Sequence, residues 1–328
     1  MMLLNTQRIV VTGGAGFIGS HLVDSLIDQG HNLICIDNFN DSYDPTIKLT
    51  NIARHQDNPR FTLAKQDIRN KEQILQIFLA YQPDIVIHLA ARAGVRESLK
   101  DPFEYMEVNI NGTLNVLNAA VASGAKKFIF GSSSSVYGIN KKVPFSEEDP
   151  LLTPISPYAA TKVAGEAICH AYAHLYQLST VALRFFTVYG PRQRPDLAIH
   201  KFTRLMREQK EITMYGDGTS RRDYTYIADI IYGIEAAMEY QPTQCFEVFN
   251  LGNSQTTELK ELISLLEQKL GQKALIDLRP PEPGDVPQTM ADIKKARHLL
   301  RFEPKIPIVE GISLFIAWLY EQQPAGSL

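Results

Sequence analysis

Short apolar runs alternate with longer amphipathic stretches over the first part of the chain. The β-branched runs predict buried strands at residues 8–12, 32–36, 61–65, 85–89, 127–131 and 180–184. Between them, apolar residues at helical spacing predict helices at residues 17–27, 71–80, 102–122 and 158–176. Because such alternation is typical of a parallel sheet with helices on both faces, we predict an α/β fold with a doubly wound parallel sheet.

Small or polar residues stand at the ends of these predicted strands. They are Thr12, Asp37, Asp67, Ala90 and Ser132. Open parallel sheets bind ligands in the crevice outside the carboxyl ends of their strands. The sequence therefore predicts that these positions meet around a ligand at one edge of the sheet.

Beyond residue 184 the chain has longer loops that are richer in Pro, Gly and Arg. We expect irregular loops at residues 185–195, 215–224 and 279–285, and helices at about 258–270 and 292–300. The apolar segment 245–252 is expected to return as a strand of the main sheet. We therefore predict a sheet-containing domain over residues 1–184 and a smaller, mixed α/β domain over residues 185–328, which binds the substrate.

Composition and charge narrow the class of protein. The 328 residues carry a formal net charge of −3, so no overall positive field attracts nucleic acid or an anionic membrane. The first residues run directly into a strand-like segment, and no apolar run is long enough to span a bilayer. The three cysteines, Cys35, Cys169 and Cys245, match no metal-ligand spacing and favour a reducing compartment. We expect a cytoplasmic protein.

A glycine-rich turn follows the first predicted strand. Gly13 permits the tight turn, Gly16 lets the backbone approach a pyrophosphate, and Gly19 lets the helix pack on the strand. The second strand ends in Asp37, where a carboxylate would bond both ribose hydroxyls of an adenosine. Together these features predict a Rossmann-type dinucleotide site. Because Asp37 would repel a 2′-phosphate and Asn38 follows it in place of an Arg, NAD is favoured over NADP.

A second group of polar residues lies in the segment 128–166. Tyr158 and Lys162 are four residues apart, so in a helix they share one face. A nearby ammonium favours the phenolate, and Lys162 is therefore expected to lower the pKa of Tyr158 and make it usable as a base. Ser133, in a run of four serines at the preceding strand end, would bond the substrate oxygen and the phenol. We predict that these three residues form a proton-handling triad.

Several motifs together resemble one family of enzymes. They are GGAGFIG at 13–19, DN at 37–38, DI at 67–68, SSVYG at 134–138, Tyr158 with Lys162, and RDY at 222–224. These motifs resemble those of the extended short-chain dehydrogenases/reductases that modify nucleotide sugars, over nearly the whole chain. Within that group, the segments ARAGVRES at 91–98 and FFTVYGP at 185–191 look like those of UDP-glucuronate 4-epimerases.

The resemblance implies a bound NAD that is reduced and reoxidised in each turnover. The implied reaction interconverts UDP-glucuronate and UDP-galacturonate by oxidation at sugar carbon 4, rotation of the 4-keto intermediate and return of the hydride to its other face. The implied cofactor-binding residues are Gly13, Gly16, Phe17, Ile18, Gly19, Asp37, Asn38, Asp67, Ile68, Leu89, Ala90, Ala91, Tyr158 and Lys162. The implied substrate-binding residues are Arg92, Ser134, Ser135, Thr187, Arg194, Arg222 and Asp285.

The hydroxyl groups of Ser134, Ser135 and Thr187 are candidates to bind the sugar carboxylate. The resembling UDP-glucuronate decarboxylases generally carry Glu in place of Ser135, and the 4,6-dehydratases carry an Asp-Glu pair in place of Ser134 and Ser135. Without an acid there, water elimination has no evident proton donor. A UDP-glucose/UDP-galactose 4-epimerase, a UDP-glucuronate decarboxylase and a catalytically silent NAD-binding scaffold remain alternatives.

The remaining polar residues are candidates for contacts with the rest of the substrate. Arg222 resembles the family arginine that holds the diphosphate, and Asp285 the residue that bonds the uridine ribose, although Glu282 departs from the family pattern in that loop. Arg192 and Arg194 are candidates for the phosphates or the carboxylate, and Arg96 adds positive charge near the sugar. His170 and His174 share a helix face without a third metal ligand, so we predict no metal site.

The family also implies an assembly. Its members usually form homodimers in which two helices of each subunit pair across a twofold axis. Here these helices are the predicted ones at 102–122 and 158–176. Their expected contact residues are Ile110, Leu114, Leu117, Ala167, Ala171 and Leu175.

Overall fold

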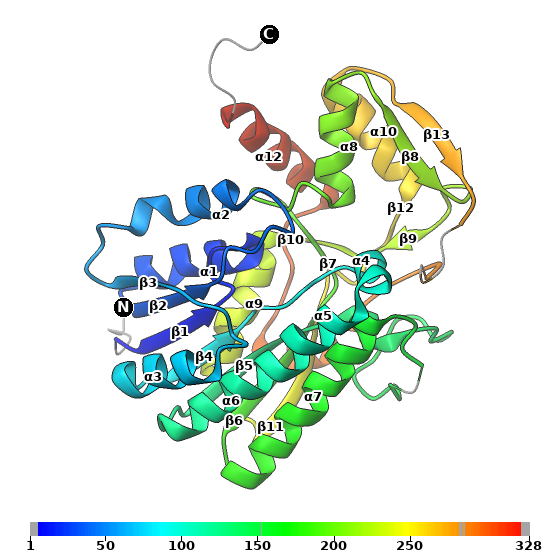
Figure 1. Ribbon diagram of the computed structural model, residues 1–328. Coiled ribbons are helices and arrows are strands. Elements are labelled where there is room, and N and C mark those ends of the chain that lie inside the picture. Colours follow the sequence, from blue (N-terminus) through cyan, green and yellow to red (C-terminus); the bar gives the residue numbers. More distant parts are fainter. Residues whose placement is uncertain (1–5, 152, 282–283, 285, 323–328) are drawn as a thin grey trace.

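The computed structural model describes residues 6–151, 153–281, 284 and 286–322. Within them, seven strands form one parallel sheet in the order β11-β6-β5-β4-β1-β2-β3 (Figure 1). The strands are β1 (Arg8–Thr12), β2 (Asn32–Asp37), β3 (Phe61–Lys65), β4 (Ile85–His88), β5 (Lys127–Ser133), β6 (Ser179–Phe185) and β11 (Phe246–Leu251). The predicted doubly wound sheet is confirmed.

Helices cover both faces of this sheet (Figure 1). On one face lie α1 (Phe17–Asp28) and α9 (Ile227–Glu239), and on the other lie α3 (Lys71–Tyr81), α6 (Thr113–Ala122) and α7 (Pro157–Tyr176). The hydrophobic core is correspondingly divided. Val10 of β1 belongs to the cluster beneath α3 and α6, whereas its neighbours Ile9 and Val11 belong to the cluster beneath α1. This alternation follows from the opposite directions of successive side chains in a strand.

The helix predicted at 102–122 is confirmed as a continuous helical segment, but it is not α-helical throughout. The structure has α5 (Pro102–Met106), a π-helical turn η2 (Glu107–Gly112) and then α6. At Gly112 a Cβ atom would lie 2.6 Å from Cδ1 of Ile68, so the helix passes this side chain only at a glycine. In the wide turn, the Asn109 side chain accepts a hydrogen bond from the backbone N–H of Arg92 at 2.7 Å and donates to the Arg92 carbonyl at 3.0 Å. The turn therefore fixes the backbone of Arg92.

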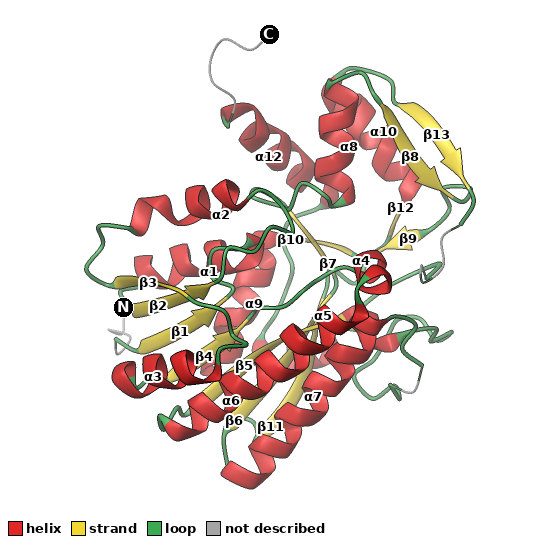
Figure 2. Ribbon diagram, viewed as in Figure 1, coloured by secondary structure: helices red, strands yellow, loops and turns green. Residues whose placement is uncertain are grey.

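The C-terminal part forms a smaller lobe beyond the carboxyl edge of the sheet (Figure 2). It contains α8 (Ala198–Arg207), α10 (Leu259–Leu270) and α12 (Ile308–Glu321). Short paired strands complete it: β7 (Thr187–Tyr189) with β10 (Tyr224–Tyr226), β9 (Arg221–Arg222) with β12 (Thr257–Glu258), and β8 (Glu211–Tyr215) with β13 (Leu275–Arg279). The prediction of irregular loops at 185–195 and 215–224 was therefore wrong where these strands lie. Strands so short carry too few residues to show an alternating pattern.

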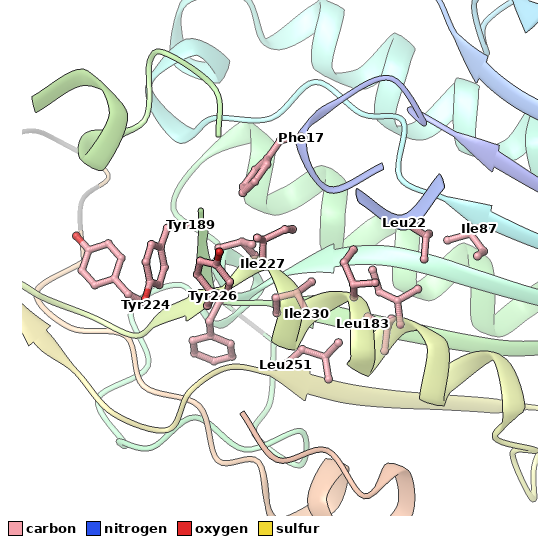
Figure 3. Packing of buried hydrophobic residues seen from close by; sticks show 14 of the residues in the cluster. Phe17, Leu22, Ile87, Leu183, Tyr189, Tyr224, Tyr226, Ile227, Ile230 and Leu251 are labelled. Atoms are coloured by element: carbon pink, nitrogen blue, oxygen red, sulfur yellow. The ribbon is translucent and has the colours of Figure 1, made fainter. Parts of the chain in front are cut away.

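Edge-on tyrosine contacts join two strands of the lobe. The ring of Tyr189 packs edge-on against Tyr224, at 6.2 Å between centroids, and against Tyr226, at 5.6 Å. Figure 3 shows these rings near Ile227, at the start of α9. Edge-to-face aromatic pairs contribute about 0.5–1.5 kcal/mol each beyond their burial. They therefore help to hold β7 and β10, which follow Phe186 and Asp223, together.

Candidate active site

A cavity of about 770 Å³ opens along the carboxyl ends of the central strands. It lies where the strand-end residues were expected to meet. The residues predicted to bind the cofactor all line it: Gly13, Gly16, Phe17, Ile18, Gly19, Asp37, Asn38, Asp67, Ile68, Leu89, Ala90, Ala91, Tyr158 and Lys162. Ser133, Arg92, Arg194 and Thr187 line the same cavity. The sequence motifs, far apart in the chain, thus form one site.

The glycine turn before α1 is shaped for close approach of a phosphate-bearing ligand. Gly13 has φ +70°, and a Cβ there would lie 2.7 Å from the backbone nitrogen of Ala90. At Gly19 a Cβ would lie 2.2 Å from the carbonyl oxygen of Gly13. Neither position admits a side chain, so the backbone amides at the N-terminus of α1 stay bare toward the cavity, where they and the helix dipole favour an anion. The residues present therefore fit a dinucleotide pyrophosphate.

Asp37 lies at the expected adenosine end of the cavity. Its Oδ1 accepts the N–H of Phe39 at 2.9 Å, and its Oδ2 accepts the N–H of Ala15 at 3.3 Å, which holds the carboxylate at the glycine turn. The Nζ of Lys48, from α2 (Pro45–Ile52), is 3.5 Å from Oδ1. Lys48 is 5% exposed, and its burial lowers its pKa. The ammonium group of Lys48 thus lies beside the Asp37 carboxylate.

Asp67 is a second acidic residue at this end of the cavity. Arg69 binds it through two parallel bonds, from Nε to Oδ1 at 3.0 Å and from Nη2 to Oδ2 at 2.8 Å. The side-chain amide of Asn38 donates to the same carboxylate at 2.8 Å. These bonds, with that of Arg69 the largest cause, hold the pKa of Asp67 at about 2, so the group is a fixed acceptor at neutral pH. The fork orders the cavity wall between β2 and β3.

The predicted triad lies at the middle of the cavity, where β5 ends and α7 begins. The hydroxyl of Ser133 accepts the N–H of Ser135 at 3.2 Å and donates to the Ser135 hydroxyl at 3.1 Å. Burial raises the pKa of Tyr158, while its hydrogen bond with Ser133 and the charge of Arg194 act in the opposite direction. Tyr158 is thus held between the serine and an arginine.

Lys162 occupies a different place from the one its spacing suggested. Its Nζ donates to the carbonyl oxygen of Gly131 at 2.6 Å, and it lies 5.0 Å from the centroid of the Phe130 ring. Burial lowers its pKa to about 8. Burial raises the pKa of Tyr158 and Lys162 is not among the groups that act against it, so the expected effect of Lys162 on Tyr158 stays a prediction. The spacing of four residues placed the two groups on one face but did not fix the direction of a long, flexible side chain.

A buried ion pair lies next to the two elements, β5 and α7, that carry the triad. Arg184 of β6 binds Glu166 of α7 through Nε at 2.9 Å and Nη2 at 2.8 Å, and both side chains are almost wholly buried. Ser132 donates to the same Glu166 carboxylate at 2.5 Å, and Arg184 also donates to the hydroxyl of Tyr137 at 2.8 Å. Ser132 is adjacent to Ser133 in β5. The pair therefore ties the end of β5 to the helix that carries Tyr158.

A smaller cavity of about 140 Å³ adjoins the triad. Its polar lining includes Ser134, Ser135, Thr187 and Arg222, which are the hydroxyls and one of the arginines predicted to bind the substrate. Thr187 lines both cavities, so the two meet at the start of β7. Gly284 also lines the smaller cavity. Asp285 and Glu282 lie outside the described residues.

The other predicted arginines differ in position. Arg92 and Arg194 line the large cavity, where Arg92 pairs with Glu104 at 2.6 Å and Arg194 with Asp196 at 2.8 Å. The guanidinium of Arg96 stacks 4.3 Å from the ring centroid of Tyr215. Arg192 points elsewhere, to Asp24 of α1 at 2.8 Å, and lines neither cavity. This position does not fit its candidacy as a phosphate or carboxylate ligand, because the guanidinium pairs with Asp24 outside both cavities.

Several cavity residues were not predicted. Tyr43, Lys48, Arg69 and Asp196 line the large cavity as well. A signal existed for Tyr43, because the polar run 38–43 directly follows Asp37 at the ligand-binding edge. No pattern marks Lys48, which looks like a surface lysine of a short amphipathic helix. Arg69 is marked only by its position after Asp67.

Some kinds of site are absent from the described part of the chain. None of its helices is both long and apolar enough to cross a bilayer. No group of three or more His, Cys, Asp or Glu residues in it could hold a metal ion. The ring of His170 instead packs edge-on against Phe246, at 5.2 Å between centroids.

Comparisons with known proteins agree with this geometry. The family model of GDP-mannose 4,6 dehydratase matches residues 10–315. A UDP-glucuronate 4-epimerase of Thermodesulfobacterium geofontis is 41% identical over 313 residues, which cover 95% of this chain and 96% of that protein.

Solved structures are similar over the same length. The crystal structure of UDP-glucuronic acid 4-epimerase from Bacillus cereus, in complex with UDP-glucuronic acid and NAD, matches with a TM-score of 0.91 and 39% identity, covering 96% of this chain and all of that one. The UDP-glucose 4-epimerase of Thermotoga maritima with UDP-glucose matches with a TM-score of 0.87 and 36% identity, covering 96% and 99%. The chain belongs to the GDP-mannose 4,6-dehydratase family of extended short-chain dehydrogenases/reductases.

Proposed function

We propose that the protein is an NAD-dependent 4-epimerase that interconverts UDP-glucuronate and UDP-galacturonate. The observation that carries this proposal is the junction of the two cavities, where a triad of Ser133, Tyr158 and Lys162 meets a pocket lined by short hydroxyls and Arg222. Relatives that resemble the chain over almost its full length bear the same activity in their names. The sequence motifs and the geometry of the site thus support the same function.

Bound NAD would supply hydride acceptance and return at carbon 4 of the sugar. Tyr158 takes the proton of the 4-hydroxyl group as that carbon is oxidised, and it gives a proton back when the hydride returns to the other face. Ser133, already bonded to the phenol, donates to the same sugar oxygen and keeps it in line. Lys162 would provide a positive charge toward the ribose of the nicotinamide. No net oxidation of the sugar occurs.

The smaller cavity gives the proposed preference for a uronic acid. A 4-keto glucuronate is a β-keto acid, and it loses carbon dioxide when its carboxylate bond turns perpendicular to the carbonyl plane. Ser134, Ser135 and Thr187 can donate several hydrogen bonds to that carboxylate and restrain its rotation. The residues in place of the acids that serve a decarboxylase or a dehydratase are hydroxyls, which supports epimerisation over those alternatives.

The UDP part of the substrate would lie along the C-terminal lobe. Arg222 lines the small cavity and would pair with the diphosphate, and Arg194 and Arg92 line the large cavity. We assign residues 1–184, together with the segment 245–252, to a nucleotide-binding domain, and the remainder of residues 185–328 to a UDP-sugar domain. The pairing of β11 with β6 supports this division.

We also propose a homodimer in the cytoplasm, formed through α5, α6 and α7. Ala167, Ala171 and Leu175 share an exposed face of α7, and Leu175 is 68% exposed. Phe103 of α5 is 82% exposed. A face of this kind gains stability when a second copy covers it. Leu117 is removed from the expected contacts, because it is wholly buried in the core of its own chain.

A substrate assay tests the proposed function directly. The purified protein is incubated with UDP-glucuronate, and its products are followed by proton NMR. UDP-galacturonate should form until equilibrium is reached, with little UDP-xylose. Parallel incubation with UDP-glucose tests the hexose alternative. Absence of reaction with UDP-glucuronate, or release of carbon dioxide as the main outcome, would refute the assignment.

A further inference from the structure

Two side chains of α1 hold a loop that follows β7. His21 and Asp24 are three residues apart and share one helix face. Nε2 of His21 lies 2.9 Å from the carbonyl oxygen of Pro191, and Oδ2 of Asp24 lies 2.8 Å from Nη2 of Arg192. Burial lowers the pKa of His21 to about 4, so the imidazole is neutral near pH 7, and Nε2 must carry the proton that the carbonyl accepts.

Asp24 has further partners that fix its carboxylate. Its Oδ1 lies 2.7 Å from Nε2 of His55 and 3.1 Å from Nε of Arg54, both in η1 (Ala53–His55). The side chains of Asp24 and Arg192 are 15% and 20% exposed. Arg192 has φ +61°, a backbone conformation that costs energy for a residue with a side chain. The contacts of Asp24 and His21 with the loop are suited to hold it there.

The same loop continues into the wall of the cofactor cavity. Arg194, Asp196 and Leu197 all line that cavity. The guanidinium of Arg194 lies 6.0 Å from the ring centroid of Tyr43, which belongs to the polar run after Asp37 and lines the cavity too. A displacement of residues 191–192 would therefore be transmitted within a few residues to the wall around the bound dinucleotide.

We propose that His21 and Asp24 form a latch, defined as their contacts with Pro191 and Arg192, which keeps the dinucleotide bound between the two half-reactions. The inference rests on the proposed epimerase function. Epimerisation requires that the nicotinamide which accepts the hydride from carbon 4 also return it after the sugar has turned over. If the wall opens in between, one 4-keto sugar and one reduced nicotinamide leave together, and the proton taken by Tyr158 passes to solvent.

Bound nucleotide provides a test that needs no turnover. Asp24→Asn keeps the size of the side chain and removes its charge, and Arg192→Met removes the guanidinium from the loop. Each protein is passed through a gel-filtration column and denatured, and the NAD released is measured by chromatography. Both variants should lose most of the NAD that the unaltered protein retains, and their dissociation constants for NAD should rise roughly tenfold, as expected for a partly buried ion pair.

Arg54→Met is the matched control. It removes another guanidinium from Asp24 without touching the loop, so retention of NAD should change less than about twofold for this exposed pair. Arg192→Lys, which keeps a positive charge, should recover part of the retention. Thermal unfolding of every variant separates loss of the latch from loss of the fold. If Asp24→Asn or Arg192→Met stays folded and holds NAD as well as the unaltered protein, the latch is refuted; equal loss in Arg54→Met would also refute it.

Turnover supplies a second, independent readout. With UDP-glucuronate and excess NAD, the latch variants should accumulate reduced nicotinamide, seen as near-ultraviolet absorbance, in step with the 4-keto sugar. The unaltered protein should accumulate neither. Should the unaltered protein fail to epimerise at all, the proposed function falls, while the nucleotide-retention measurement still decides whether the latch holds NAD.

Discussion

The ammonium nitrogen of Lys162 lies 2.6 Å from the carbonyl oxygen of Gly131, at the floor of the cofactor cavity. Its side chain is buried, its pKa is lowered to about 8 by burial, and the nearest ring, that of Phe130, offers only a weak electrostatic partner. A buried ammonium with so few partners destabilises the fold. Its presence is therefore best explained by the chemistry of the site.

We expect Lys162→Met to stabilise the protein. In the fold, Lys162 releases its proton near pH 8, whereas in the unfolded chain it does so near its ordinary value of 10.5. Between these values the unfolded state binds more protons, so the free energy of unfolding of the unaltered protein should rise with pH. The variant lacks this penalty and should be more stable by about 3 kcal/mol at pH 7.

Denaturant titrations from pH 7 to pH 10, on protein freed of nucleotide, measure this effect. In the variant, the slope of the free energy of unfolding against pH should be smaller by the equivalent of about one bound proton. Some slope should remain, because burial also lowers the pKa of Lys127 to about 8. An unchanged slope would show that Lys162 keeps an ordinary pKa in the fold.

Tyr158→Phe should abolish turnover while the cofactor stays bound. General acid–base catalysis typically contributes about 10²–10⁴-fold, so kcat should fall by roughly a thousandfold. Tyr105→Phe is the matched control, since its ring packs edge-on against Tyr158 at 6.2 Å and its hydroxyl bonds only the Ala93 carbonyl among the described partners. Comparable loss in both variants would point to packing, and full activity of Tyr158→Phe would remove the proton-transfer role.

The hydroxyls of the small cavity should control which product forms. Thr187→Val keeps the shape of the side chain and removes the hydroxyl, so the carboxylate of the 4-keto intermediate should rotate more freely and leave as carbon dioxide more often. We expect the ratio of UDP-xylose to UDP-galacturonate to rise roughly tenfold, in keeping with the loss of one charge-assisted hydrogen bond. Proton NMR of the products measures the ratio.

Ser179→Ala serves as the control for this series, because Ser179 begins β6 at the end of the sheet away from the site. Its product ratio should match that of the unaltered protein. Ser135→Ala should act in the same direction as Thr187→Val. A variant that slows epimerisation without any change in the ratio would show that these hydroxyls do not restrain the carboxylate.

The large features of the fold and site were predictable because they follow from local rules. Apolar periodicity located the strands of the main sheet, and the carboxyl-edge rule then brought Gly13, Asp37, Asp67 and Tyr158 to one cavity although they are far apart in sequence. These predictions depend on backbone geometry alone. They do not depend on how individual side chains pack.

The features that the sequence did not reveal depend on packing and side-chain direction. The π-helical turn ends at Gly112, which faces Ile68 in a contact between segments distant in the chain. The direction of Lys162 toward Gly131, and of Arg192 toward Asp24, is decided by the nearest acceptor in three dimensions. Neither acceptor is marked by spacing within the motif that contains the cation.

The exposed face of α7 gives a test of assembly. Leu175→Asp places a charge at a position that is 68% exposed in the single chain and central to the proposed helix pairing. The change should leave the monomer folded and shift the sedimentation behaviour from dimer to monomer, because an unpaired charge is costly in an apolar interface. Leu278→Asp, at a position 64% exposed on β13, should leave the dimer intact. Dimers that persist in Leu175→Asp would place the interface elsewhere.

Removal of one partner of the Arg184–Glu166 ion pair should destabilise the protein, whereas removal of both should destabilise it much less. Arg184→Met leaves the Glu166 carboxylate buried with Ser132 but without its cation, and it should lower the free energy of unfolding by about 3–5 kcal/mol. Combining it with Glu166→Leu removes the stranded charge, so the double variant should recover much of that loss in denaturant titrations.

The same double variant separates stability from positioning at the end of β5. With both charges gone, Ser132 loses its bond to α7, and the hydroxyl of the adjacent Ser133 is no longer held at a fixed height beside Tyr158. We therefore expect a protein of near-normal stability whose kcat is lowered roughly tenfold or more, since misplacement of a catalytic group by about 1 Å can cost up to a hundredfold. Binding of NAD should change little, because neither Glu166 nor Arg184 lines the cavity. Normal kcat in a stable double variant would show that the ion pair serves folding alone.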